Sequence, residues 1–318
     1  MNEIPMTWPL ARYKFVFKVV ESMDLPDYAG SAFRGAFGRA LRKTACMTRL
    51  TDCSSCPLRS TCAYTAIFET PAPTEHSLQS FHNVPNPYVI EAPLGGQRKL
   101  HTGEQLEFSV VLFGDALQRL ALIVYAMQRA FNEKTGSKGP DYRVCQGKAQ
   151  LEAVFLETES GSDLIYEKGD SSIKPHNQSV TLLMPKQRAD VQLRFVTPLR
   201  LQNNGKIYGA KDIEPLPLLT ALVRRIGLLA EFHGEKPNLD YHALRETALS
   251  VESSHALKWQ NWKRYSSRQQ KSMYLGGLVG TWTLSQVPEA LQIFLELGSY
   301  LHVGKNASFG LGRYEILH

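Results

Sequence analysis

The sequence predicts an α+β protein made of two tandem domains with the same order of strands and helices. Segments in which apolar residues alternate, as in half-buried strands, are interleaved with segments in which they recur every three or four positions, as in amphipathic helices. The same order of segments begins again after about residue 188. A chain of 318 residues that is 43% hydrophobic is long enough to give each domain its own core.

In the first half, alternation predicts strands over residues 12–19, 106–112, 149–156 and 180–184. Helical spacing predicts two helices, over residues 28–43 and 117–131, and the first of them is rich in arginine. The span 44–93 carries turn residues, prolines and little periodicity, which we interpret as a cysteine-rich insertion.

In the second half, strands are expected over residues 191–195 and 313–317, with helices over 216–232 and from Pro288 onward. A β-rich stretch over residues 250–284 lies between the two helices. The order in both halves is close to the β-α-β-β-α-β plan of ferredoxin-like (RRM-like) domains. We therefore expect domains over residues 1–187 and 188–318.

The charge balance permits an anionic partner without identifying one. Lysine and arginine total 36 against 30 acidic residues, which gives a formal net charge of +6. No segment approaches the run of about 18 apolar residues that a membrane helix needs. Because the first residues also lack the apolar core of a signal peptide, we expect a cytoplasmic protein without membrane contact.

Four of the five cysteines are clustered with the spacing C-x6-C-x2-C-x5-C, at Cys46, Cys53, Cys56 and Cys62. In a cytoplasmic chain such a cluster favours metal binding over disulfides. Four thiolates suit a structural zinc ion, and an iron–sulfur cluster uses the same ligands and stays open as an alternative. With no ligand position left for a substrate, we expect a structural site or an interaction surface.

Four segments resemble, in the same order, the CRISPR-associated repeat-RNA (pre-crRNA) processing endoribonucleases of the RAMP superfamily. The strongest is the C-terminal glycine-rich segment Leu301-His-Val-Gly-Lys-Asn-Ala-Ser-Phe-Gly-Leu-Gly-Arg-Tyr314. The other three are Phe33-Arg-Gly-Ala-Phe-Gly-Arg-Ala-Leu41, Val196-Thr-Pro-Leu-Arg-Leu201, and Trp259-Gln-Asn-Trp-Lys-Arg-Tyr-Ser-Ser-Arg-Gln269 with Met273-Tyr-Leu-Gly-Gly277. The resemblance spans both halves and implies two RAMP domains.

The resemblance implies a nuclease that cuts CRISPR repeat RNA without a metal or other cofactor in its chemistry. In this family the ribose 2'-OH attacks the adjacent phosphate and leaves a 2',3'-cyclic phosphate and a 5'-OH. Such a reaction needs a base, an acid and a cation beside the phosphate. The family's first helix often carries a catalytic histidine, and residues 28–43 contain none.

Because the first helix lacks a histidine, other residues become the catalytic candidates. Arg39 stands where related helices have histidine, and it could supply the cation while a histidine comes from elsewhere. His302, next to Gly304 and Lys305, would lie near the phosphate if the glycine-rich loop does, and it could equally be a structural residue. His82 could reach the cleft and is equally consistent with a surface position. Lys305 is the second candidate cation.

The candidate RNA contacts fall into three groups. The glycine-rich loop offers Gly304, Lys305, Gly310, Gly312 and Arg313, because glycine lets backbone N–H groups approach phosphate. The first helix offers Arg34 and Arg42. The block 255–274 interleaves cations, including Arg264 and Arg268, with aromatic rings that can stack on bases. A plain glycine turn and an ordinary hairpin are the structural alternatives.

Three functions are compatible with these residues. The first and leading one is the repeat-RNA endoribonuclease, which the resemblance across both halves, including the final loop, favours and which could also retain its guide-RNA product. The second is a non-catalytic RAMP subunit that binds guide RNA in a CRISPR effector complex, an interpretation favoured by the missing helix histidine. The third is an interaction module whose cysteines recruit another CRISPR protein, such as an adaptation protein.

Overall fold

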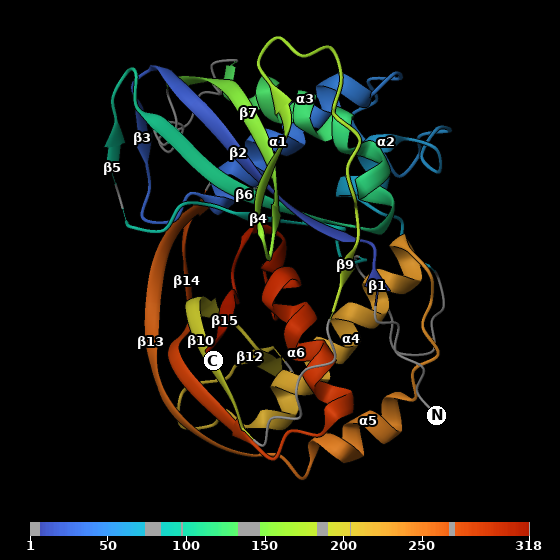
Figure 1. Cartoon of the computed structure of the whole chain (residues 1–318), viewed down its shortest axis with the longest axis vertical. Helices are drawn as coiled ribbons and strands as arrows, with labels where there is room; N and C mark the ends of the chain where they lie inside the picture. The colour runs from blue at the N-terminus through green and yellow to red at the C-terminus, as the bar shows by residue number, and fades with distance from the viewer. Residues whose placement is uncertain are drawn as a thin grey trace. The chain divides into compact units, whose positions relative to one another are not determined.

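The computed structural model describes residues 7–73, 84–96, 98–132, 147–182, 190–203, 205–266 and 271–317. These residues form two compact units. The first unit consists of Ala11–Gln178 and Tyr265–Lys271, and the second consists of Met1–Leu10, Ser179–Arg264 and Ser272–His318. Figure 1 shows the helices and strands of both units.

The sheet of the first unit has the strand order β4-β6-β2-β7-β8. Its strands are β2 (Leu10–Glu21), β4 (Tyr88–Glu91), β6 (Gln105–Phe113), β7 (Lys148–Thr158) and β8 (Gly161–Glu167). The connecting elements are β3 (Met23–Leu25), α1 (Gly30–Ala45), α2 (Ala63–Phe68), β5 (Arg98–Leu100), η1 (Gly114–Arg119) and α3 (Leu120–Asn132). Without the added edge strand β8, the order is that of a ferredoxin-like sheet.

The core of the first unit is a cluster of phenylalanine rings between the sheet and helices α1 and α3. Phe108 on β6 lies 5.7 Å from Phe15 and 5.6 Å from Phe17, between ring centroids. Its ring also contacts Phe33 of α1 at 5.0 Å and Phe131 of α3 at 5.4 Å. The alternation over 12–19 thus buries one face of β2, and the other face carries Arg12, Lys14 and Lys18.

The sheet of the second unit has the strand order β13-β14-β10-β15. The four strands are β10 (Asp190–Leu199), β13 (Glu252–Ser266), β14 (Lys271–Ser285) and β15 (Tyr314–Leu317). The other elements are β11 (Gln202–Asn203), β12 (Lys206–Ile207), α4 (Pro215–His233), α5 (Tyr241–Ala248), α6 (Glu289–Leu301) and η3 (Ala307–Phe309). Helices α4 and α6 pack side by side (Figure 1), and β10 pairs antiparallel with both β14 and β15.

The α+β fold class with two ferredoxin-like units is confirmed. Each unit follows the order β-α-β-β-α-β. The predicted helices over 28–43 and 216–232 and the one from Pro288 begin within two residues of α1, α4 and α6. The helix predicted over 117–131 corresponds to the end of η1 followed by α3. One strand differs: residues 180–181 form β9, which pairs with β1 (Thr7–Trp8) and not with the first sheet. In the described part of the chain, no helix is both long and apolar enough to cross a membrane.

The span 44–93 is not all insertion, because its last residues form the edge strand β4. All four residues of β4 are buried, so their sequence is continuously apolar up to Glu91 and shows no alternation. Strand β8 and helix α5 were also not expected. Only one residue of β8 is buried and only Leu244 and Ala248 of α5 are, which leaves too short an apolar pattern to recognise.

We expect Phe108→Ala to destabilise the first unit by about 3–5 kcal/mol, because it removes a ring that four others contact and leaves a cavity. The matched control is Phe155→Ala on β7, whose ring is only half-buried beneath Lys14. Urea unfolding followed by circular dichroism measures both. Equal destabilisation by the two variants would contradict this account of the core.

Candidate nucleic-acid interface

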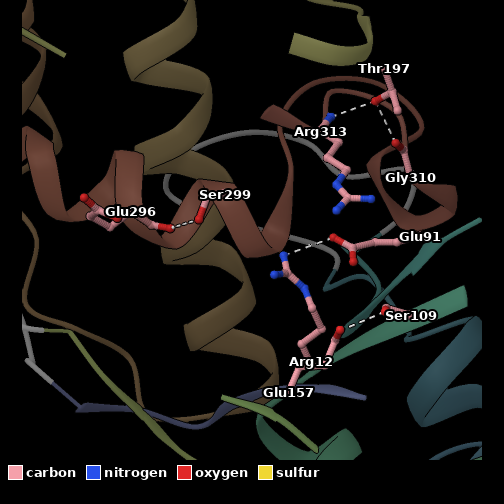
Figure 2. A network of polar contacts seen from close by, with 9 residues as sticks. All are labelled: Arg12, Glu91, Ser109, Glu157, Thr197, Glu296, Ser299, Gly310 and Arg313. Carbon is pink, nitrogen blue, oxygen red and sulfur yellow. Dashed lines mark hydrogen bonds and ion pairs between the residues drawn. The ribbon is translucent and has the colours of Figure 1, made fainter. Parts of the chain in front are cut away.

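The segment from His302 to Arg313, here called the glycine-rich loop, joins α6 to β15 and is fixed to the end of β10. The buried hydroxyl of Thr197 donates to the Gly310 carbonyl at 2.8 Å and accepts the N–H of Arg313 at 2.8 Å (Figure 2). Near the other end of the loop, the N–H of Lys305 donates to the Arg200 carbonyl at 2.9 Å. The loop is therefore attached to the second sheet at both of its ends.

Two glycines of the loop are required by close backbone approaches. Gly304 has φ +87°, and a Cβ there would lie 2.6 Å from the Arg200 carbonyl oxygen. Gly312 has φ +67°, and a Cβ there would collide with the Val303 carbonyl oxygen. Both positions thus exclude other residues for reasons of local packing.

The hydrogen bonds of the loop differ from the expectation that its glycines present free N–H groups to phosphate. The N–H of Gly310 donates to Ala307 at 2.8 Å and that of Gly312 donates to Pro198 at 3.0 Å. Both glycines are also buried. These donors are already used inside the chain, so the charge of the loop must come from its side chains.

Lys305 is the exposed cation of the loop, and Arg313 is half-buried at its end. Arg200 was not singled out from the sequence, although it lies in the block 196–201. Its carbonyl holds Lys305, and its guanidinium donates to the Gly276 carbonyl on β14. Arg200 thus connects the loop to the neighbouring hairpin.

His302 is fully buried at the C-terminal end of α6. Its N–H donates to the Gly298 carbonyl at 2.8 Å and its backbone adopts φ +57°, where the helix ends. An imidazole closed to solvent cannot touch a bound phosphate in this conformation. The geometry favours the structural alternative for His302.

The hairpin of β13 and β14 carries two large exposed rings. Trp259 is 46% exposed and Tyr274 is 70% exposed. The Trp259 indole lies against Gly276, and its Nε1–H donates to the Asn261 side chain at 2.8 Å. This bond fixes the orientation of the ring, so one exposed aromatic face is held in place.

Two predicted contacts of the hairpin cannot be placed. Arg268 and the side chain of Arg264 lie outside the described residues, as does the catalytic candidate His82. Lys258, one residue before Trp259, is exposed and supplies positive charge on the described part of the hairpin.

In the first unit, helix α1 displays the predicted arginines in different surroundings. Arg39 and Lys43 are exposed. The guanidinium of Arg34 lies 4.3 Å from the centroid of the Phe68 ring of α2. Arg42 donates to the carbonyls of Leu50 and Thr51 at 2.6 and 2.8 Å.

These contacts separate the roles of the α1 arginines. Arg42 is committed to the loop that follows α1, which gives it a structural role beside any contact with RNA. Arg39 is exposed on α1, with its guanidinium near Gly35, and is accessible to a phosphate.

A row of polar side chains crosses the face of the first sheet opposite to the one on which α1 and α3 pack. Arg12 on β2 donates to the buried carboxylate of Glu91 at 3.1 Å (Figure 2). Ser109 on β6 donates to Glu157 on β7 at 2.9 Å, and Arg12 and Glu157 are direct register partners. No sequence pattern indicates the Arg12–Glu91 pair, because 79 residues separate the two.

The four clustered cysteines line one cavity of about 120 Å³ between the end of α1 and the start of α2. The Arg49 N–H donates to Cys46 Sγ at 3.2 Å and lowers the pKa of that thiol, whereas desolvation raises the pKa of Cys53. Among the residues that the structure describes, no three histidine, cysteine or acidic side chains stand close enough to hold a metal ion as they are.

Each of the two ferredoxin-like units matches one family model, and the unit closed by the glycine-rich loop matches that of an endoribonuclease. The chain belongs to the family of the AF_1859_N N-terminal domain, whose model matches residues 7–178. Residues 193–314 match the model of the CRISPR-associated endoribonuclease Cas6. The protein is thus an endoribonuclease that acts on CRISPR precursor RNA.

Individual relatives cover almost the whole chain. An uncharacterized protein of Archaeoglobus fulgidus is 24% identical over 298 residues, which are 92% of each chain. A Cas6 product complex is 16% identical with a TM-score of 0.55, covering 97% of this chain and 100% of that one. Thermus thermophilus Cas6 is 17% identical with a TM-score of 0.53, covering 98% and 99%. At these identities the solved structures establish the fold.

We expect Gly312→Ala to destabilise the second unit by about 2–4 kcal/mol, because it combines left-handed backbone strain with a collision against Val303. Gly96→Ala is the matched control, since Gly96 has φ +79° and a Cβ there would have nothing within 4 Å, and should cost about 1 kcal/mol. Thermal unfolding of both variants measures the difference. Similar values for both would show that the collision is relieved.

Proposed function

We propose that this endoribonuclease cuts within the CRISPR repeat by attack of a ribose 2'-OH on the adjacent phosphate, without a metal ion in the reaction. The products are a 2',3'-cyclic phosphate and a 5'-OH. The observation that carries the proposal is the rigid glycine-rich loop, which presents exposed Lys305 from the Cas6-like half of the chain. A cation held in this way can stabilise the extra charge of the pentacovalent phosphate.

The proton transfers need groups other than His302. Because His302 is buried, we assign it to positioning the glycine-rich loop at the end of α6. His82 stays the histidine candidate for acid–base catalysis, although it lies outside the described residues. Arg39, exposed on α1, is the second candidate cation.

The RNA contacts that we propose are of two kinds. Lys305, Arg313, Lys258 and Arg39 neutralise phosphates, and their contribution is salt-dependent and independent of sequence. Trp259 and Tyr274 stack on unpaired bases, because exposed aromatic faces bind bases of any kind. Repeat RNA is the substrate and guide RNA is the product that the protein could retain.

We also propose that the protein binds other CRISPR proteins, without specifying which ones. A chain of a partial Cas6-RT-Cas1–Cas2 complex is 16% identical with a TM-score of 0.57, covering 97% of this chain and 46% of that one. This neighbour supports testing adaptation proteins as partners in the cytoplasm.

The test is incubation of purified protein with repeat RNA from its own CRISPR array in EDTA, with and without a 2'-deoxy substitution at the cut site. We expect one cut that survives EDTA and is lost with the 2'-deoxy substrate. Lys305→Ala, Arg39→Ala and His82→Ala should each reduce cleavage by about 10²–10⁴-fold if they take part in the chemistry. Tight binding without cleavage would instead support the guide-holding subunit.

We expect Trp259→Ala to weaken binding of single-stranded repeat RNA by about 5- to 150-fold, because it removes about 1–3 kcal/mol of base stacking. Tyr125→Ala is the matched control, since Tyr125 is an aromatic residue of α3 that is 54% exposed. Fluorescence anisotropy with labelled RNA gives both affinities. Stacking by Trp259 is excluded if the two variants bind equally well.

A further inference from the structure

The segment from Cys46 to Cys62, here called the cysteine loop, has a defined conformation and no core of its own. None of its 17 residues is buried, and Met47, Leu50 and Leu58 are 84%, 43% and 38% exposed. A loop of this length without buried apolar side chains needs another source of stability, because ordering each residue costs conformational entropy.

The backbone of the cysteine loop folds around its sulfur atoms. The N–H of Cys56 donates to the Cys53 carbonyl at 3.3 Å, which closes a tight turn over the C-x2-C pair. The N–H of Arg49 donates to Cys46 Sγ at 3.2 Å, so a second turn points a backbone donor at a thiol. Cys62 is the residue that precedes the first turn of α2. All four cysteines face the same cavity.

We propose that Cys46, Cys53, Cys56 and Cys62 bind one zinc ion as four thiolates, and that this ion holds the cysteine loop in place. Each thiol releases its proton when it binds, and the four sulfur atoms complete a tetrahedral shell with no position for a substrate. The sulfur atoms must move inward to reach the ion, and the unpacked surroundings of the loop allow it.

Zinc is favoured over an iron–sulfur cluster by the ligand spacing. The intervals are six, two and five residues, and the central C-x2-C is a ligand pair that structural zinc sites use. The intervals match neither the bacterial nor the plant-type ferredoxin pattern.

The zinc site would determine how α2 packs on α1. Phe68 of α2 lies on Gly38, where a Cβ would collide with its ring, and it stacks on Tyr64 at 5.5 Å. The same two rings lie beneath the guanidinium groups of Arg34 and Arg42, at 4.3 and 5.7 Å. Because α2 starts directly after Cys62, loss of the ion would loosen the start of α2 and the contact between Tyr64 and Arg42. Phe68 has further contacts with Phe37 and Tyr88, at 6.2 and 5.9 Å.

The test begins with the metal content of the whole purified chain after dialysis against metal-free buffer, measured by mass spectrometry. We expect about one zinc ion per chain in the natural protein and in Cys145→Ser, and none in Cys53→Ser or Cys56→Ser. Cys145 lies outside the described residues and serves as the matched removal of one thiol. Iron with acid-labile sulfide, or wild-type protein without zinc, would overturn the proposal.

A second measurement does not depend on variants that fold poorly. Zinc is removed from the natural protein with a chelator and replaced by cobalt, whose absorption spectrum identifies tetrahedral thiolate coordination. Limited trypsin digestion then compares cleavage after Arg49 and Arg59 with and without metal. We expect thiolate-to-cobalt bands and at least about tenfold slower cleavage with metal, which corresponds to about 1.4 kcal/mol of protection. Absence of both effects contradicts zinc binding, whatever the outcome of the RNA assays.

Discussion

The buried hydroxyl of Thr197 determines where the glycine-rich loop lies. It satisfies one carbonyl and one N–H of the loop at the same time, so the chain leaves α6, turns and enters β15 along one path. The carbonyl oxygens of Pro198 and Arg200 add two further bonds from the same strand end. Because a buried backbone group without a partner is costly, the loop cannot move away from β10 without losing all of these bonds together.

The sequence was sufficient for most of the fold because most elements have a buried face and a polar face. Residues 12–19 and 191–195 show this as alternation, and 216–232 shows it as helical spacing. The pattern fails where burial is complete or nearly absent. Strand β4 is buried on both faces and β8 is mostly exposed, so neither has the period that distinguishes a strand from its surroundings.

The site was predictable in its residue types and less so in their roles. The block 301–314 located the loop, but its spacing could not reveal that the Gly310 and Gly312 amides are bonded internally or that His302 is buried. The Gly312 amide is bonded to Pro198 of β10, far earlier in the chain, and the burial of His302 is a property of the completed fold. The Arg12–Glu91 pair has the same origin, since only the completed sheet brings β2 and β4 within reach.

The internal hydrogen bonding of the glycine-rich loop also decides which molecule adapts during binding. A loop in which most backbone N–H groups are already bonded, among them those of Lys305, Gly310 and Gly312, has lost much of its backbone freedom at the time of folding. It therefore has little entropy left to lose when a ligand arrives. The ordering cost then falls on the nucleotides and on a few side chains such as Lys305, at about 0.5–1.5 kcal/mol for each side chain immobilised. The protein would therefore select among RNA molecules by how readily each one adopts the required backbone shape before it binds.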